Sequence, residues 1–417
     1  MGPKTKPLFI QSLLILCLVI ASSTPASAQD GKGPLSKLSV HGFLTQAYAT
    51  SSLSSGGFFS PTVDELILGI PEDGTWDYRA MALQFRYQIT DKDVMIVQLS
   101  SRSLGESPIN DVEDDIELDW AFYERRIGDN TAIKLGRVQI PFGIFNELRD
   151  VGTVLPFYRP PYVMYQEGSF TSETVDGLVF SHTFAPASDW ALEFDFWIGE
   201  YDFFEVDPFV EGGQASAAKA EDAFGFQLWL NTPIPALRFG LGGQRRDVTG
   251  GLVGTFRLPD ESDQFEDWYV SVDLDLEKFV FRGEYREFTT DGGQIFFGGD
   301  FSVSYIQIGF HPTEKFRIYG QAEFSEANHD ADDFTVPFGL PATQEVSVDL
   351  RRDYGIALNY LFAPHLVLKV EHHFDVDAEL FSFLPVPAFT PQGPRLQPIF
   401  ATSEGGDYTI ASFSVSF

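Results

Sequence analysis

Apolar and polar residues alternate with a period of two along most of this chain. Between residues 79 and 89, every second side chain is apolar, and the side chains between them are small or polar. A period of two puts successive side chains on opposite faces of a β-strand. No window of comparable length fits helical spacing better, so the pattern predicts an all-β protein.

Sixteen segments carry this pattern, and the connections between them alternate in length. Seven connections are short turns and eight are long loops rich in glycine and acidic residues. The predicted strands are residues 37–50, 78–89, 94–102, 116–126, 132–140, 175–184, 190–199, 223–231, 237–246, 267–276, 279–288, 301–311, 316–326, 350–362, 366–374 and 408–417.

This organisation is typical of a transmembrane antiparallel β-barrel of about 16 strands, with short periplasmic turns and long extracellular loops. Such barrels have strands of about 9–11 residues, and closure gives every backbone group in the lipid a partner. Aromatic residues such as Trp190 and Phe279 flank the short turns, as in an interfacial girdle. A soluble β-sandwich is the alternative, but it does not explain the alternation of turn and loop lengths.

The first 28 residues predict a secretory signal peptide. Lys4 and Lys6 precede an apolar run over residues 8–21, and Ala26-Ser27-Ala28 forms an A-x-A cleavage site. Cleavage leaves residues 29–417 as a single β-barrel domain. The only cysteine, Cys17, leaves with the signal, so the mature chain has no disulfide, thiol nucleophile or thiolate metal site.

Acidic residues dominate the charge of the chain, which has 60 acidic and 28 basic side chains. Such a charge argues against nucleic acid as a partner, and 15% aromatic residues argue against disorder. The eight long loops carry a net charge of −33, so almost all of the excess lies on one rim of the predicted barrel. Clusters at residues 111–115 and 330–333 could bind divalent cations that bridge to lipopolysaccharide phosphates. Their spacing is not that of an EF-hand, so no dedicated metal site and no cofactor is predicted.

The alternation also predicts which charged side chains point into the barrel. Arg86, Arg102 and Arg125 are expected to face inward from early strands, together with Glu117 and Asp119. The charged residues expected to face inward from later strands are Arg238, Arg282, Arg286, Arg317, Asp273, Glu284, Glu323 and Glu371. Large apolar residues are scarce at the expected inward positions, which favours an open lumen over a filled one.

The third long loop, residues 141–174, is the candidate constriction loop. It holds many aromatic residues and the rigid pair Pro160-Pro161, which an external loop exposed to water seldom carries. Folding back against the barrel wall would bury the aromatic residues and bring charged residues into the pore. The alternative is a loop that packs over the mouth of the barrel. The charged candidates in this loop are Glu147, Arg149, Asp150, Arg159 and Glu167.

The segment from Leu135 to Gly143 resembles the GR-x-x-x-PFG stretch of the phosphate-selective porin O/P and DcaP-like families. The chain ends in Phe417, with Val415 and Phe413 on the same face, and this resembles the C-terminal assembly signal of bacterial outer-membrane proteins. These resemblances imply a porin of the Gram-negative outer membrane: a homotrimer that is inserted by the barrel-assembly machinery and lets small hydrophilic solutes or ions diffuse passively. The mature chain has only eight lysines and its loops are acidic, which departs from the basic channels of the phosphate-selective members.

The alternatives to a channel are a barrel that acts as an adhesin or receptor, and a barrel hydrolase. The chain contains no G-x-S-x-G or H-E-x-x-H motif, and no spacing suggests a Ser-His-Asp arrangement. The sequence therefore favours a protein that is not an enzyme.

Overall fold

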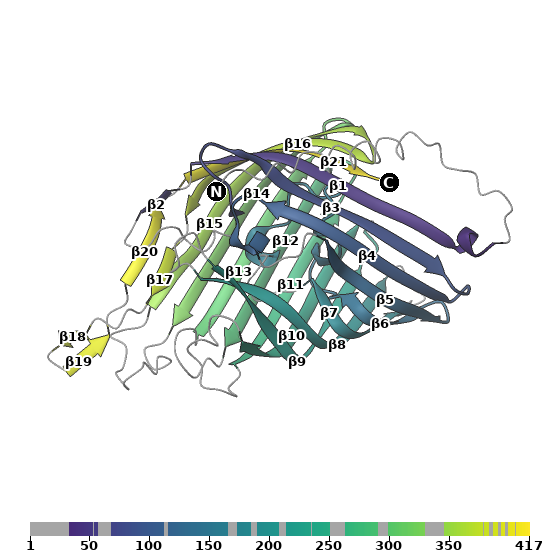
Figure 1. The fold of residues 1–417 in the computed structure, drawn as a ribbon, viewed down its shortest axis with the longest axis horizontal. Helices are drawn as coiled ribbons and strands as arrows, with labels where there is room; N and C mark the ends of the chain where they lie inside the picture. Colours follow the sequence, from purple (N-terminus) through teal and green to yellow (C-terminus); the bar gives the residue numbers. More distant parts are fainter. Residues whose placement is uncertain are drawn as a thin grey trace, which may run out of the picture.

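The protein forms a closed β-barrel of sixteen antiparallel strands in the computed structural model (Figure 1). Each strand pairs with its neighbours in the sequence, and β1 pairs with β21 to close the barrel. The structure describes residues 33–52, 54–56, 68–111, 116–165, 173–184, 190–207, 214–234, 236–250, 263–290, 299–329, 346–377, 379–382, 387–390, 393–396, 399–404 and 406–417.

All sixteen predicted strands are confirmed, most of them within a few residues at each end. The strands β8, β9 and β15 are longer than predicted at the ends that lead into the long loops. The residues there are acidic or small, and they weaken the alternation of apolar and polar side chains. The barrel strands are β1 (Leu38–Ser51), β3 (Thr75–Gln88), β4 (Asp93–Leu104), β5 (Glu117–Ile127), β6 (Thr131–Gln139), β7 (Thr174–Phe184), β8 (Ala191–Asp207), β9 (Gln214–Asn231), β10 (Leu237–Gly250), β11 (Asp263–Asp275), β12 (Phe279–Thr290), β13 (Gly299–Phe310), β14 (Phe316–His329), β15 (Val346–Ala363), β16 (Leu366–Asp377) and β21 (Gly406–Ser416).

The remaining elements are short. One three-stranded sheet has the order β17-β20-β2 and a hairpin joins β18 to β19, both beyond the barrel end that carries the long loops (Figure 1). Among the described residues, no helix is long and apolar enough to cross a membrane. These elements are η1 (Pro34–Lys37), β2 (Ser54–Gly56), η2 (Pro108–Asp111), η3 (Asn146–Leu148), α3 (Tyr162–Tyr165), β17 (Glu379–Ser382), β18 (Pro387–Thr390), β19 (Gly393–Leu396) and β20 (Ile399–Glu404).

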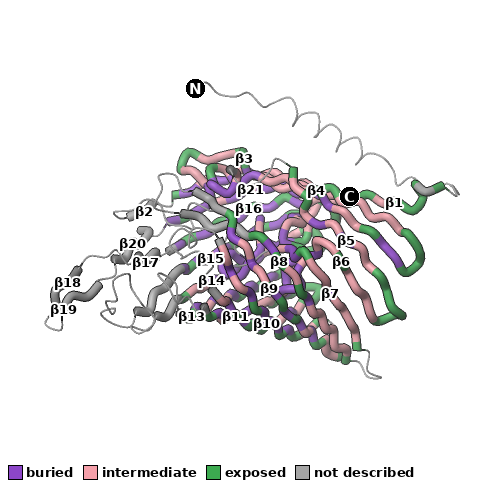
Figure 2. Tube along the Cα trace, turned by 60° about the horizontal axis from the view of Figure 1, so that its bottom comes forward, coloured by how far each residue is buried: buried purple, intermediate pink, exposed green. Residues whose placement is uncertain are grey.

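The outer surface of the barrel is apolar. Leucine, isoleucine, valine and phenylalanine side chains from nearly every strand are exposed there, for example Leu135, Ile308 and Val370. The aromatic residues that flank the short turns are exposed as well, among them Trp190, Phe279 and Phe362. Figure 2 shows that buried residues run along the strands, whereas the turns between strands are exposed. An apolar outer wall with aromatic residues at its edge suits a lipid environment.

A bulge in β5 reverses the side-chain alternation within that strand. In the pairing with β4, Leu99 lies opposite Leu118, and Gln98 lies opposite Trp120, so Asp119 is an extra residue. One extra residue moves all following side chains to the other face of the sheet.

The predicted inward orientation of Arg125 is therefore wrong. Arg125 follows the bulge and lies on the outward side with Tyr123, at the end of β5. Its side chain is 57% exposed, and its Nη1 atom is 3.0 Å from Asp93 Oδ1. The same bulge turns Trp120 and Phe122 inward, where both are buried.

The prediction that large apolar side chains are scarce inside the barrel is also wrong. Aromatic side chains from β3 to β21 point inward and are buried, and they pack against the third loop in three clusters. The inward rings include Tyr78, Trp120, Phe122, Trp197, Trp229, Tyr269, Tyr305, Tyr319 and Tyr408. The sequence pattern assigned some of these rings to the wrong face, and it did not anticipate that tyrosine and tryptophan would alternate with small residues on the inner wall.

Candidate constriction site

The third loop follows β6 and contacts the opposite wall of the barrel. Backbone N–H groups of the loop donate hydrogen bonds to three glutamates on that wall. Ile144 donates to Glu284 on β12 at 3.1 Å. Farther along the loop, Val163 donates to Glu323 on β14 at 2.8 Å. Tyr158 donates to Glu371 on β16 at 2.6 Å. These contacts place the described part of the loop against the inner face of β12–β16.

Two backbone carbonyls of the loop are bound by the same wall. The side-chain amide of Asn359 on β15 donates to the Pro156 carbonyl at 2.9 Å. The Lys369 ammonium on β16 donates to the Phe157 carbonyl at 2.7 Å. The backbone of this part of the loop is bound by side chains of the wall and not by the backbone of a strand. These side chains therefore supply the hydrogen-bond partners that its buried carbonyl groups need.

Arginine side chains and aromatic rings add a second set of contacts between loop and wall. The guanidinium groups of Arg282 and Arg286 on β12 lie 5.4 and 5.0 Å from the ring centres of Phe145 and Phe142, respectively. On β15, Arg351 lies 4.4 Å from the ring centre of Tyr162. These distances are within the range of cation–π attraction.

The loop also approaches the seam where the barrel closes. A side chain at Gly152 would place its Cβ 2.3 Å from Thr45 Oγ1 on β1 and 2.5 Å from Ser414 Oγ on β21. Next to it, the Thr153 hydroxyl donates to Ser416 at 3.2 Å. Only glycine lets the loop backbone pass this close to the wall.

Five of the predicted site residues come together between the loop and strands β3–β5. Arg102, Arg149, Asp150 and Arg159 line one small cavity, together with Thr45, Ala80, Leu104 and Tyr158. Asp119 lies beside this group and accepts a hydrogen bond from Gln98 at 2.8 Å. The cavity volume is about 20 Å³, which is room for about one water molecule.

Glu173, which the loop adds at its far end, links the arginines of this cluster. Its Oε1 atom is 3.0 Å from Arg149 Nε and 3.6 Å from Arg102 Nη1. Burial, with the negative charges of Glu173 and Asp119, raises the pKa of Asp150 well above its ordinary value. Arg102 and Arg149 act in the opposite direction. The cluster thus holds three arginines and three carboxyl groups.

Arg159 packs against two aromatic rings. Its guanidinium lies 5.6 Å from the ring centre of Tyr78 and 5.9 Å from that of Tyr158, and it donates a short hydrogen bond to the Tyr78 hydroxyl. Tyr78 belongs to β3, so this contact joins the loop to a strand that only β1 and β21 separate from β16.

The other side of the loop is exposed. Glu147 lies in η3 with half of its side chain exposed, and its carboxylate is 3.8 Å from Lys134 Nζ on β6. Leu148 is 46% exposed and Val154 is 52% exposed. The following residues, 155–165, are largely buried. Open space in the barrel therefore lies beside Glu147, Leu148 and Val154.

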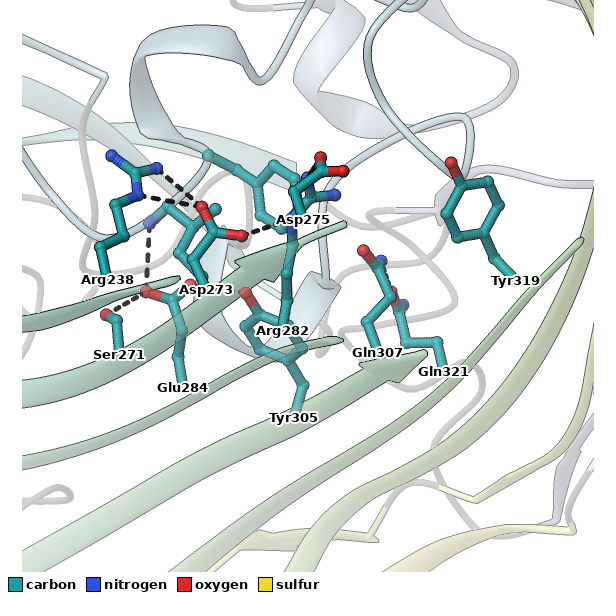
Figure 3. Close-up of polar contacts among 12 residues, drawn as sticks. Arg238, Ser271, Asp273, Asp275, Arg282, Glu284, Tyr305, Gln307, Tyr319 and Gln321 are labelled. Atoms are coloured by element: carbon teal, nitrogen blue, oxygen red, sulfur yellow. Dashed lines mark hydrogen bonds and ion pairs between the residues drawn. The ribbon is translucent and has the colours of Figure 1, made fainter. Parts of the chain in front are cut away.

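A second polar row crosses the inner face of strands β10–β14 (Figure 3). Asp273 accepts from Arg238 at 2.9 Å and from Arg282 at 3.0 Å, and Arg282 also reaches Asp275 at 2.9 Å. Gln307 donates to Gln321 at 2.7 Å in the same row. The inward orientation that the sequence predicted for these arginines is correct.

The remaining predicted residues lie apart from the cluster. Arg86 shares the inward face of β3 with Ala80, but it lies near the short β3–β4 turn. Glu117 precedes the β5 bulge and pairs with Ser100. Arg137, in the segment that resembles GR-x-x-x-PFG, lies on the outward side of β6, 3.8 Å from Asp176. Glu167 and the predicted signal peptide lie outside the described residues, as do 112–115 and 330–333 of the acidic clusters.

The inner wall also carries buried charges that were not among the predicted site residues. Asp267 accepts from Arg246 at 2.8 Å and from Arg286 at 2.7 Å, and Asp353 accepts from Arg351 at 2.8 Å and lies 2.8 Å from His373 Nδ1. They lie inside the predicted strand ranges, toward the strand ends that lead into the long loops. Continuing the two-residue alternation from Asp273 and Asn359 toward the long loops would have placed Asp267, Arg351 and Asp353 on the inner face.

Solved outer-membrane proteins share this fold at low sequence identity. OmpT of Vibrio cholerae matches with a TM-score of 0.55, 10% identity, and 91% of this chain and 97% of that chain covered. The outer membrane channel DcaP of Acinetobacter baumannii matches with a TM-score of 0.51 at 9% identity, and OmpF of Salmonella typhi, solved with daunomycin, with 0.54 at 10%. Both cover 91% of this chain and 97% of their own.

These comparisons confirm the predicted resemblance to outer-membrane porins at the level of the fold. Neither a protein-family model nor a curated protein sequence matches the chain.

Proposed function

We propose that this protein is an outer-membrane channel for passive diffusion of small hydrophilic solutes or ions, and that its third loop narrows the pore. The observation that carries the proposal is the path of the loop. Its backbone crosses from β6 to hydrogen-bond acceptors on β12, β14 and β16, so it occupies a large part of the cross-section.

The solute path in this proposal runs between the exposed side of the loop and strands β6–β8, along the edge of the charge cluster. The loop is packed against strands β12–β16, whereas Glu147, Leu148 and Val154 are exposed on its other side. A solute on this path passes Lys134 and Glu147, and then the charge cluster around Arg102 and Asp150. Opposite charges on two sides of a narrow aqueous passage orient dipolar solutes, because walls of low dielectric constant focus the electric field. The narrow width of the passage slows large solutes.

The proposal places the barrel in the outer membrane. The apolar outer wall and the exposed aromatic residues at the short turns support this location, as does the predicted signal peptide. It includes assembly by the barrel-assembly machinery, contact of the acidic loops with lipopolysaccharide through divalent cations, and a homotrimer. A trimer form has been solved for OmpT of Vibrio cholerae, whose fold is similar.

Single-channel recording in planar bilayers tests this function. We expect discrete conductance steps from the folded, detergent-purified protein, and we expect liposomes that contain it to swell in small sugars but not in large ones. A barrel that resists SDS at room temperature, yet gives neither conductance nor swelling, would exclude the proposal. Retention of fluorescent solutes by size then measures the width of the pore.

A further inference from the structure

We infer that Glu284, Glu323 and Glu371 are positioning residues that together clamp the third loop and set the width of the channel. The inference rests on the proposed function, because width has meaning only for a channel. It goes beyond that function by assigning the control of width to three buried side chains of the barrel wall. None of the three belongs to the charge cluster at Arg102 and Asp150.

The three glutamates have the same relationship to the loop. They lie on alternate strands, β12, β14 and β16, and each is at most 4% exposed. Glu284 and Glu323 both pair with Tyr305 of β13, so they occupy the same level of the wall. Each of the three accepts a hydrogen bond from a loop backbone N–H group, at 3.1, 2.8 and 2.6 Å for Glu284, Glu323 and Glu371.

The acceptors are themselves fixed by other contacts. Glu284 accepts from Ser271 at 2.5 Å and from Tyr305 at 2.8 Å, and it also accepts a short hydrogen bond from Tyr165 of the loop. Glu323 accepts from Gln321 at 2.7 Å. The bonds from Ser271, Tyr305 and Gln321 orient the carboxylates of Glu284 and Glu323, and an oriented acceptor holds its donor at a defined distance.

The chemistry of the contact suits a clamp better than a solute site. A backbone N–H group in the lumen that lost its partner would be costly, and a carboxylate is the strongest side-chain acceptor available. Because the donors are backbone groups, the contact fixes the path of the loop whatever its side chains are. The side chains that face the open side, such as Glu147 and Leu148, can then vary without moving the loop. Three contacts over residues 144–163 leave the loop little freedom to swing.

Substitutions that separate hydrogen bonding from packing test the clamp. Glu323→Met keeps the length of the side chain but removes the acceptor, whereas Glu323→Gln keeps a carbonyl acceptor without the charge. We expect the Met variant to give higher and noisier single-channel conductance, and the Gln variant to behave almost like the parent. Glu326→Ala is the control, because Glu326 lies on the same strand with an exposed, outward side chain. The same design applies to Glu284, with Glu287 as its outward control.

Amide hydrogen exchange gives a readout that does not need a working channel. Losing one charge-assisted hydrogen bond should speed exchange of the Val163 amide by about tenfold or more in Glu323→Met. In the same variant, the Ile144 and Tyr158 amides should change less. If Glu323→Met fails to assemble, Glu371→Met provides a separate test with its own amide, that of Tyr158.

The outcomes separate the clamp from the proposed function. A parent protein without conductance overturns the function, while the amide exchange still reports whether each glutamate holds its N–H group. A conducting parent whose Met variants keep both the conductance and the amide protection overturns the clamp. Equal effects of Met and Gln substitutions would assign the role to charge alone, which also overturns the clamp as stated.

Discussion

Phe417 and Gly42 are joined by a reciprocal pair of backbone hydrogen bonds. The N–H group of each residue donates to the carbonyl of the other at 3.0 Å. The two residues lie at opposite ends of the chain, so their pairing completes the seam between β21 and β1. A Cβ at position 42 would lie 2.7 Å from the Phe417 ring and 2.8 Å from the Ala82 carbonyl, which explains why glycine occupies this position.

Deleting Phe417, or replacing Gly42 with alanine, should weaken closure of the barrel. The deletion removes both hydrogen bonds, and Gly42→Ala forces the Phe417 ring or β3 to move, at a cost of about 1–3 kcal/mol. Both variants should lose resistance to SDS at a lower temperature than the parent, as measured by the shift in gel migration on heating. Gly320→Ala is the matched control, because an added Cβ there meets no atom within 4 Å. An unchanged transition temperature in Gly42→Ala would mean that the seam tolerates the added methyl group.

The strands could be predicted from the sequence because each one separates two different surroundings. One face meets an apolar environment and the other meets the lumen, so the two-residue period is visible without any tertiary information. The same reasoning predicted the inward acids Glu284, Glu323 and Glu371. It could not predict their role, because the loop residues that they bind are between about 120 and 215 positions away in the chain.

The errors also have physical causes. A single extra residue, Asp119, reverses the pattern for the rest of β5, and nothing in the local sequence marks it as a bulge. Trp120 and Phe122 look like lipid-facing residues by type, although they pack against other rings inside. An apolar residue looks the same in the sequence whether its side chain contacts lipid or a folded loop. Only the structure distinguishes these two environments.

Neutralising Arg102 should make the channel more selective for cations. Arg102 is 24% exposed and lines the cavity beside Asp150, while the predicted rim carries a large excess of negative charge. In Arg102→Gln we expect a larger cation preference, measured as the reversal potential in a potassium chloride gradient. The effect should persist at high salt, where the Debye length is about 8 Å or less and the charges of the rim no longer act on ions deeper in the channel. Arg125→Gln is the control, because Arg125 lies on the outward side of β5 and should leave the reversal potential unchanged. Equal shifts in the two variants would contradict the assignment of Arg102 to the solute path.

Acid should shift the selectivity of the channel toward anions through Asp150. Its pKa is raised by burial and by the carboxylates of Glu173 and Asp119, so it takes up a proton at a higher pH than an ordinary aspartate. Protonation removes one negative charge from the cluster and leaves its three arginines charged. The cation preference should therefore fall as the pH decreases, and this change should begin at a pH at which exposed carboxylates are still ionised. In Asp150→Asn the same pH scan should show a smaller change, and an equal change would assign the titration to another group.

A cysteine placed at Glu147 should report directly on the solute path. The mature chain has no cysteine if the predicted signal peptide is removed, so a single introduced thiol is the only one present. Half of the Glu147 side chain is exposed on the open side of the loop, and a reagent of the size of a small solute can reach it there. In Glu147→Cys, a bulky methanethiosulfonate reagent should lower the conductance of each open channel, and a reducing agent should restore it. Leu155→Cys is the control, since Leu155 lies in the same loop but is only 2% exposed. A modified Glu147→Cys barrel, verified by mass, with unchanged conductance would place the path elsewhere in the lumen. If Leu155→Cys were blocked at the same rate, the loop would have to move away from the wall during conduction, and the packing of its inner side would no longer define the closed part of the cross-section.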